Sequence, residues 1–325
     1  MSICFIGGTG RSGTTVLKKT FDQHPDVFCP GQEIRIINDP DGLIDFYNSM
    51  ISGWSYFSFD KKIRRLDSFL SKAGSIRPTE KIISLVFKYS GLRRILPCKP
   101  EFQYNWLNLS NICPKYSNLK NEFINNLLAF KYPGYWVGSK IFSKYIYYGN
   151  PKTKPELTHI IGNFLQNIVR NTLEYYKCKH FVNDDAMNFI WFDKIQNFLP
   201  NAKLIHIYRD PRDVVCSYTK QKWGPADPVQ SMEIYKDLMD RWLIVKQELP
   251  DESFMQVSLE KLVNDTKSTI KEICLFLNVD FHTNLLRIDL SKSNSGRWKK
   301  ELNHQQKDIM NKYLGKYIHV FGYDI

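Results

Sequence analysis

Short apolar runs and longer amphipathic stretches follow one another along most of this chain. The run Ile3–Ile6 is apolar throughout and ends at glycines, which is typical of a short strand buried on both faces. Residues 14–22 then have the apolar spacing of a helix that stops before His24-Pro25. The pattern predicts further strands at 27–29, 181–182, 202–208 and 254–257, and further helices at 156–176, 188–198, 229–247, 266–277 and 304–314.

Strands that alternate with helices predict an α/β fold with a central parallel sheet flanked by helices. The expected organisation is a single domain over residues 1–325. Residues 39–131 interrupt the alternation with an irregular, mainly helical and aromatic-rich pattern, so we expect a helical insertion there that shapes a substrate pocket. A further strand is expected at 135–141. Ligands bind parallel sheets at the carboxyl ends of the strands, and both motifs described below follow predicted strands.

The composition is that of a globular protein, with 43% apolar and 14% aromatic residues. The absence of any long apolar stretch predicts no membrane segment, and no basic region precedes the first apolar run as it would in a signal peptide. The seven cysteines are scattered without a CxxC pair, which argues against a disulfide framework and a zinc site. A reduced, cytoplasmic location is therefore expected.

The formal net charge is +12, and the lysines are spread along the chain in short clusters only. Two interpretations stay open, namely an ordinary solvated surface and a site for an anionic substrate or cofactor. The motifs are needed to choose between them.

The first motif is the stretch GGTGRSGTT, directly after the strand Ile3–Ile6. A glycine-rich turn between a strand and a helix is suited to bind a phosphate group. The spacing from Gly8 to Gly13 is that of a P-loop, but Thr14 stands where the P-loop lysine would be. Arg11 is the candidate to supply the missing positive charge.

The second motif is IHIYRDPRDVVCSY, where the strand at 202–208 gives way to a helix. Asp210 as N-cap, Pro211 at the first helical position and Asp213 in the first turn have structural explanations. Arg209 and Ser217 do not, and an arginine with a hydroxyl is suited to bind phosphate. Arg209 also comes before Asp210 at this strand end, which makes it a poor place for a magnesium ligand, so we expect no metal.

Together RSGTT, FLPNAKLIHIYRDPRDVVCSY, LEKLVNDTKSTIKEICLFLNV and SNSGRWKKEL resemble the sulfotransferases that use 3′-phosphoadenosine 5′-phosphosulfate (PAPS), nearest to the tyrosylprotein and bacterial enzymes. The resemblance implies a P-loop-like sulfotransferase fold, PAPS as cosubstrate, adenosine 3′,5′-bisphosphate as product and no metal. It implies that Arg209 and Ser217 bind the 3′-phosphate. The implied 5′-phosphosulfate residues are Arg11, Ser12, Gly13, Thr14 and Thr15, and the implied closing loop contains Ser295, Gly296 and Arg297.

The stretch CPGQEIRII is similar to the E-x-R segment of tyrosylprotein sulfotransferases, in which the glutamate is the catalytic base. The resemblance implies that Glu33 is the general base and that Arg35 orients it or stabilises charge. The alternatives are a plain surface Glu–Arg pair at this position, and His24 as the base.

Two positions depart from the family pattern. Asp184 stands in VNDDAMN where a lysine that assists the leaving group is expected, and Leu259 stands where an aromatic residue is common. An acid near a polyanion is unfavourable, so either Lys140 substitutes for the missing lysine or activity is reduced.

The expected function is therefore transfer of a sulfuryl group from PAPS to a hydroxyl of a carbohydrate, a protein tyrosine or a small molecule. Two alternatives stay open. A P-loop kinase would bind ATP and Mg²⁺. A non-catalytic polyanion-binding protein would use the net charge and show steep salt dependence. No nucleic-acid partner is expected.

Overall fold

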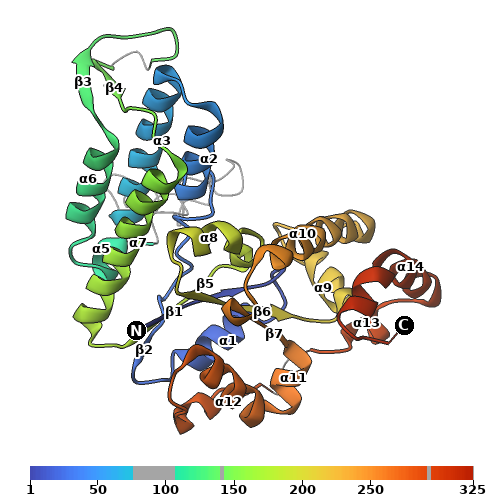
Figure 1. The fold of residues 1–325 in the computed structure, drawn as a ribbon. Coiled ribbons are helices and arrows are strands. Elements are labelled where there is room, and N and C mark those ends of the chain that lie inside the picture. Colours follow the sequence, from blue (N-terminus) through green and yellow to red (C-terminus); the bar gives the residue numbers. More distant parts are fainter. Residues whose placement is uncertain (76–106, 140–142, 291–293, 325) are drawn as a thin grey trace, which may run out of the picture. The chain divides into compact units, whose positions relative to one another are not determined.

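The computed structural model describes residues 1–75, 107–139, 143–290 and 294–324 (Figure 1). The chain divides into two compact units. Unit 1 consists of Met1–Cys29, Lys179–Gln196 and Asn201–Ile325, and unit 2 consists of Pro30–Cys178 and Asn197–Pro200. The single domain expected from the sequence stays a prediction.

Unit 1 contains a five-stranded sheet in the order β2-β5-β1-β6-β7. All of its neighbouring strands pair in parallel, so the predicted α/β fold with a central parallel sheet is confirmed. The strands are β1 (Ser2–Gly7), β2 (Val27–Phe28), β5 (His180–Asp184), β6 (Ala202–Tyr208) and β7 (Phe254–Ser258).

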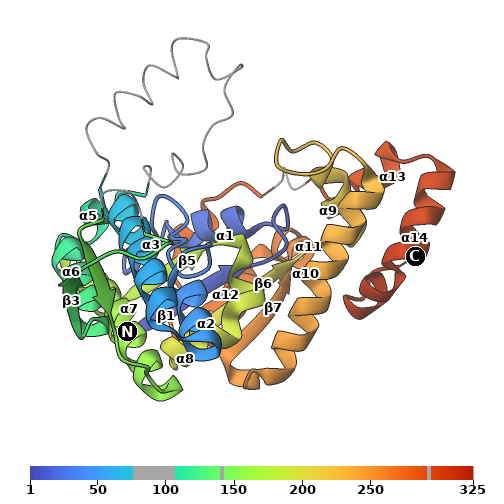
Figure 2. The same cartoon turned by 90° about the horizontal axis from the view of Figure 1, so that it is seen from above.

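Helices cover both faces of this sheet, with α1, α11 and α12 on one face and α8, α9 and α10 on the other (Figures 1 and 2). The segment expected as one helix at 188–198 is a 3₁₀-helix, Ala186–Trp191, followed by α8. The α-helices are α1 (Thr14–Phe21), α8 (Phe192–Phe198), α9 (Pro211–Tyr218), α10 (Pro228–Glu248), α11 (Leu259–Asn264), α12 (Thr266–Leu277), α13 (Arg297–Glu301) and α14 (His304–Val320).

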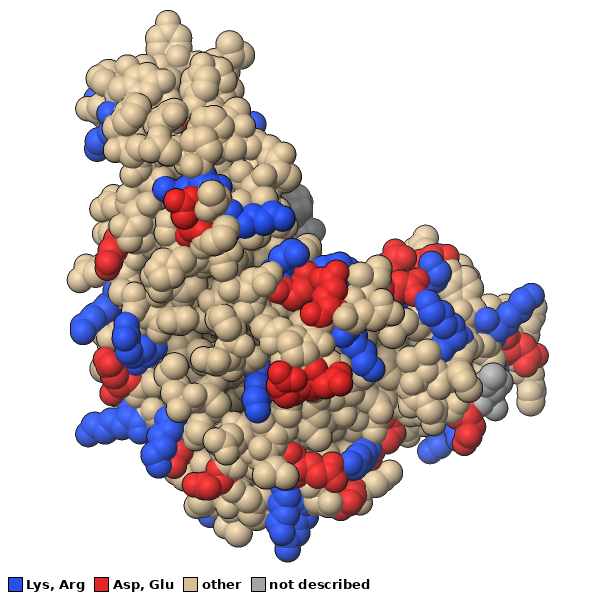
Figure 3. Space-filling view, viewed as in Figure 1, with Lys and Arg blue, Asp and Glu red and all other residues tan. Residues whose placement is uncertain are grey.

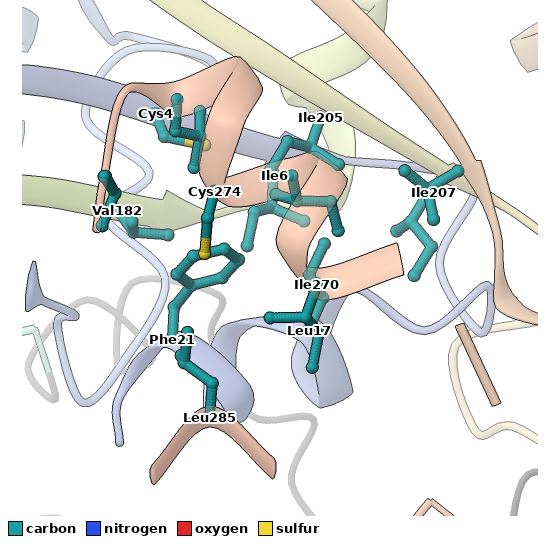
Figure 4. Packing of buried hydrophobic residues seen from close by; sticks show 14 of the residues in the cluster. Cys4, Ile6, Leu17, Phe21, Val182, Ile205, Ile207, Ile270, Cys274 and Leu285 are labelled. Atoms are coloured by element: carbon teal, nitrogen blue, oxygen red, sulfur yellow. The ribbon is translucent and has the colours of Figure 1, made fainter. Parts of the chain in front are cut away.

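The core of unit 1 follows from the alternation of side chains along its central strands. On β6, Ile205 and Ile207 join the buried cluster that also contains Leu17 of α1 and Ile270 of α12 (Figure 4). His206, between them, points to the opposite face and stacks on a phenylalanine ring there. Strands with both faces buried need apolar side chains at nearly every position, which explains the continuous apolar runs in the sequence.

The described part of unit 2 is mainly helical, and the insertion expected at 39–131 stays a prediction. The helix α7 begins with a capping box, in which Thr153 and Glu156 exchange hydrogen bonds between side chain and backbone. None of the described helices of either unit is both long and apolar enough to cross a membrane. The elements are α2 (Leu43–Gly53), α3 (Tyr56–Gly74), α5 (Leu109–Ile112), α6 (Tyr116–Leu127), α7 (Lys154–Tyr176) and the antiparallel strands β3 (Phe130–Pro133) and β4 (Tyr145–Tyr148).

The strand expected at 135–141 is wrong in its described part, because residues 135–139 form the loop between β3 and β4. Ser139 N donates to Trp136 O at 2.8 Å and Trp136 N donates to Ser139 Oγ at 2.9 Å, which closes a turn. The indole of Trp136 donates to Asp60 Oδ2 at 3.0 Å. These hydrogen bonds replace the ladder that a strand would need.

Candidate functional site

The glycine-rich loop between β1 and α1 turns back on itself. Gly10, Arg11 and Gly13 have φ angles of 71°, 60° and 111°, in the left-handed region. A Cβ on Gly8 would lie 2.3 Å from Ile207 O, so only glycine fits at that position. The loop ends at the amino terminus of α1, where backbone N–H groups and the helix dipole favour an anion.

Ser12 lies inside this loop and is fully buried. Among the described residues, its Oγ has no hydrogen-bond partner. A buried hydroxyl without a partner costs about 1–3 kcal/mol, so a ligand that offers acceptor atoms here would relieve that cost. A buried hydroxyl that is left to donate a hydrogen bond fits a loop that binds an anion.

The second motif follows β6, which pairs directly with β1, so the ends of the two strands are neighbours. Asp210 is the N-cap of α9, and its carboxylate accepts from Arg212 N at 2.9 Å. Arg209 is 5% exposed, and its Nη2 donates to Asp213 Oδ2 at 3.0 Å. Its Nε has no partner among the described residues. Arg209 is therefore held through its Nη2 atom, and its Nε–H is still available as a hydrogen-bond donor.

The two motifs meet through a hydrogen bond. Arg11 Nε donates to Ser217 Oγ at 3.1 Å, and Arg209 Nη1 lies 3.5 Å from Arg11 O. Two arginines and a buried hydroxyl thus converge from loops that are far apart in the sequence. Their charges suit a ligand with two anionic groups.

Asp213 connects the second motif to the segment that precedes α13. Its fully buried carboxylate accepts from Gly296 N at 2.7 Å and from Trp298 N at 3.0 Å. Arg209 Nη2 also donates to Asn294 O at 2.5 Å. The Arg209–Asp213 ion pair therefore holds the loop that the sequence predicts to close over a nucleotide.

Trp298 has a structural role that goes beyond packing. Its indole nitrogen donates to Asp210 Oδ2 at 3.0 Å. The guanidinium of Arg212 lies 3.8 Å from the centre of its ring and also pairs with Asp210. The buried arginine thus joins the start of α9 to α13.

These elements surround a cavity of about 310 Å³, a volume within the range of small-molecule sites. Seven of the residues that the sequence assigns to the nucleotide line it, whereas Ser12, Ser295 and Gly296 lie nearby in the chain without lining it. Those seven are Arg11, Gly13, Thr14, Thr15, Arg209, Ser217 and Arg297.

Sequence reasoning missed several residues of the cavity wall. Asn294 belongs to the quoted stretch SNSGRWKKEL, but nothing in that stretch marks it as a lining residue. Leu259 was singled out as a departure from the family pattern and does line the cavity. The remaining unassigned lining residues are Val16, Val263, Asp289 and Leu290. Val16 and Val263 are apolar positions on helix faces, which give no signal that separates them from core, and Asp289 and Leu290 lie outside any helix.

Asp184, at the end of β5, is buried and does not line the cavity. Lys18 Nζ of α1 lies 3.9 Å from its Oδ1, with side-chain exposures of 12% and 5%. The acid is thus accompanied by a cation, which reduces its repulsion of an anion nearby. Lys140, the expected substitute for the missing lysine, lies outside the described residues.

Glu33 and Arg35 belong to unit 2, and their placement beside the glycine-rich loop stays a prediction. Arg35 Nη1 lies 3.1 Å from Glu33 Oε2, and Arg35 Nη2 lies 2.8 Å from Asp39 Oδ1. Both side chains of the Glu33–Arg35 pair are about two-fifths exposed, at 39% and 40%. The carboxylate is thus oriented by an arginine and still reaches solvent.

His24, the alternative base, is buried in unit 1 and uses both ring nitrogens. Its Nε2 lies 2.8 Å from Asp280 O, and its Nδ1 accepts from Asp26 N at 3.1 Å. These contacts explain His24 as part of the turn after α1.

Parts of this chain match known proteins in sequence. The profile described as "Sulfotransferase family" matches residues 150–283. Residues 150–283 are therefore similar in sequence to the sulfotransferase family. Protein-tyrosine sulfotransferase of Drosophila melanogaster is 57% identical over 37 residues, which are 11% of this chain and 7% of that protein. Human protein-tyrosine sulfotransferase 1 is 51% identical over 37 residues, or 10% of its length. The chain therefore covers a tenth or less of these relatives.

The described fold resembles that of a solved sulfotransferase domain. The sulfotransferase domain of the Synechococcus olefin synthase superposes with a TM-score of 0.51 and 16% identity, covering 100% of this chain and 96% of that domain. The match confirms the predicted sulfotransferase fold. The described residues contain no cluster of three or more His, Cys, Asp or Glu side chains placed to hold a metal ion.

Proposed function

We propose that the protein transfers a sulfuryl group from PAPS to a hydroxyl acceptor. The observation that carries this proposal is the cavity onto which both arginine motifs open. PAPS has a 5′-phosphosulfate and a 3′-phosphate, and so presents two separate anionic groups to the wall of its site. Arg11 with the two threonines, and Arg209 with Ser217, supply two matching sets of donors.

The residues present fit this cosubstrate. Ser12 Oγ and Arg209 Nε are buried donors without a described partner, and the close approach to Ile207 O leaves no room for a side chain at Gly8. We assign Arg11, Ser12, Gly13, Thr14 and Thr15 to the 5′-phosphosulfate. Arg209 and Ser217 take the 3′-phosphate, and the loop of Ser295, Gly296 and Arg297 closes over the nucleotide.

PAPS supplies an activated sulfuryl group. Its transfer forms a bond from the acceptor oxygen to sulfur, breaks the bond from sulfur to the 5′-phosphate oxygen and releases adenosine 3′,5′-bisphosphate. In our proposal Glu33 takes the proton of the acceptor hydroxyl, and Arg35 keeps the carboxylate oriented. Arg11 and the loop stabilise charge on the transferring group. The acceptor is a carbohydrate, a protein tyrosine or a small molecule.

Lys140 is proposed to assist the leaving phosphate, since Asp184 replaces the expected lysine. If so, Lys140→Ala lowers turnover, while binding of adenosine 3′,5′-bisphosphate changes little. Unchanged turnover in Lys140→Ala, alongside inactive Arg11→Ala, would show that this lysine has no such role.

Calorimetric titration with adenosine 3′,5′-bisphosphate, and with ATP and Mg²⁺ in parallel, tests the nucleotide assignment. We expect tight binding of the bisphosphate and weak binding of ATP. Tight binding of ATP with none of the bisphosphate would overturn the proposal in favour of a P-loop kinase. Polyanion binding without either nucleotide would favour the non-catalytic alternative.

A further inference from the structure

The hairpin of β3 and β4 in unit 2 has an unusual surface. It displays large apolar and aromatic side chains, with Tyr135 at 83% exposure and Phe130 at 55%. Every residue of β3 is exposed. Figure 1 shows the hairpin at one end of unit 2, beside α3. The exposed large side chains of this surface are Phe130, Tyr132, Tyr135, Val137 and Tyr145, and we call them the aromatic hairpin.

The charged side chains of the hairpin segment, residues 130–148, are all positive. Residues 130–148 include three lysines and no aspartate or glutamate, and the acid-free stretch extends from Phe123 to Pro155. Lys131 lies over the ring of Tyr145, 5.4 Å from its centre, which places a cation beside one of the exposed aromatics. In the face shown in Figure 3, the surface over the hairpin is mainly tan, with lysines and arginines at its edges.

A buried carboxylate holds the hairpin in place from beneath. Asp60 of α3 is 2% exposed, and it accepts from Trp136 Nε1 at 3.0 Å, Tyr147 N at 2.9 Å and Arg64 Nε at 2.8 Å. Ile146 is buried on the same strand. The exposed rings are therefore presented by an anchored framework. Phe130 and Tyr132 lie on one face of the hairpin and Tyr145 on the other, so the hairpin exposes aromatic rings on both faces. Large apolar side chains exposed close together mark an interaction site.

We propose that the aromatic hairpin binds the surface of a membrane that contains anionic phospholipids. Tyrosine side chains favour the boundary between headgroups and acyl chains, because the ring is apolar and its hydroxyl group stays hydrated there. Lysines near that surface are attracted by anionic headgroups. Phe130 and Val137 have no polar atom in their side chains, so an anionic polymer without an apolar part would leave them in water. This inference is independent of the proposed catalytic function.

The test is cosedimentation of the full chain with vesicles of phosphatidylcholine mixed with phosphatidylglycerol, and with vesicles of phosphatidylcholine alone. We expect binding to the mixed vesicles and much weaker binding to the neutral ones. Lys131→Gln with Lys144→Gln should weaken binding about 25-fold, from about fivefold for each lysine. Tyr135→Ser with Val137→Ser should weaken it by about tenfold.

Matched controls lie elsewhere on the chain. Tyr175→Ser removes an exposed ring from α7 in the same unit, and Lys267→Gln with Lys271→Gln removes two exposed charges from α12. Both controls should bind vesicles as the native chain does. The hairpin substitutions replace exposed side chains, so the thermal midpoint of unfolding should stay unchanged and separate lost binding from lost folding.

Three results would overturn the inference. The native chain fails to bind mixed vesicles, or the hairpin variants bind as well as the controls. The third result is that the native chain binds dextran sulfate but not vesicles. In that case the hairpin substitutions, Tyr135→Ser with Val137→Ser included, would weaken the binding to dextran sulfate by the factors expected for vesicles. Sedimentation velocity adds a further check, because a dimer that the hairpin substitutions abolish would make a second copy of the chain the partner.

Discussion

Arg11 Nε donates a hydrogen bond to Ser217 Oγ at 3.1 Å, although the two residues are 206 positions apart in the sequence. The bond exists because β1 and β6 are parallel neighbours, so the loops that follow them meet at the same edge of the sheet. Both residues line the cavity. The glycine-rich loop and α9 therefore contribute to the wall of one cavity.

Ser217→Ala should weaken binding of adenosine 3′,5′-bisphosphate by about 10- to 100-fold, since a hydrogen bond to a charged group contributes about 1.5–3 kcal/mol. Binding of AMP, which has no 3′-phosphate, should change much less. Isothermal titration of both nucleotides measures the difference. Thr219→Ala is the control, because Thr219 ends the same helix without lining the cavity. Equal losses for both nucleotides would contradict the assignment of Ser217 to the 3′-phosphate.

Asp213→Asn should destabilise unit 1 by about 3 kcal/mol, because breaking a buried ion pair leaves the charge of Arg209 uncompensated. The amide also replaces one of the oxygens that accept from Gly296 N and Trp298 N. Urea unfolding gives the free energy. Asp251→Asn, an exposed position in a 3₁₀-turn, should change it by less than about 0.5 kcal/mol. A native-like midpoint for Asp213→Asn would show that the pair does not hold the loop.

Glu33→Gln should lower kcat by about 100-fold or more and leave bisphosphate binding within about twofold, since loss of a general base affects the chemical step. Release of adenosine 3′,5′-bisphosphate from PAPS, followed with each acceptor class in turn, gives kcat. The matched control is Glu122→Gln, an exposed glutamate on α6 of the same unit. If Glu33→Gln turns over as fast as the control, another group is the base.

The sequence identifies a residue of the cavity wall most easily where neither helix capping nor core packing explains that residue. Arg209 follows a strand and precedes a helix that is already capped by Asp210, so its presence indicates a ligand. Gly8 and Gly13 in the P-loop spacing likewise predict the turn. Asp213 was explained as an acid in the first turn of a helix, which is true. Its bonds to Gly296 and Trp298 depend on tertiary structure that local patterns do not contain.

The loop at 135–139 shows the opposite case. Its apolar and aromatic residues have the composition of a strand, and the sequence alone predicts one. The buried Asp60, far away in the chain, accepts from the Trp136 indole and fixes a turn there instead. A hydrogen-bond acceptor on α3 thus overrides the β-propensity of residues 135–139. The contact between Lys18 and Asp184 could not be predicted for the same reason, because it follows from the packing of α1 against β5.

His206 should make the stability of unit 1 depend on pH. Burial, with a smaller effect of the charge on Lys246, lowers the pKa of His206 from 6.5 to about 3. Its ring stacks on Phe189 at 5.1 Å between centres, and its Nε2 has no hydrogen-bond partner among the described residues. Between pH 6.5 and about 3 the unfolded chain binds a proton that the folded chain does not. This contribution to stability is therefore fully present above pH 6.5 and declines as the pH falls, by about 1.4 kcal/mol per pH unit.

His206→Phe keeps the stacked ring and removes the titrating group. The free energy of unfolding of this variant, relative to the native chain, should therefore rise as the pH is lowered from neutral, with urea unfolding at a series of pH values as the measurement. His159→Gln, which removes an exposed histidine of α7, should leave the native pH dependence unchanged. If the curves for His206→Phe and the native chain run parallel, His206 takes up no proton on unfolding, and the acid sensitivity comes from other groups.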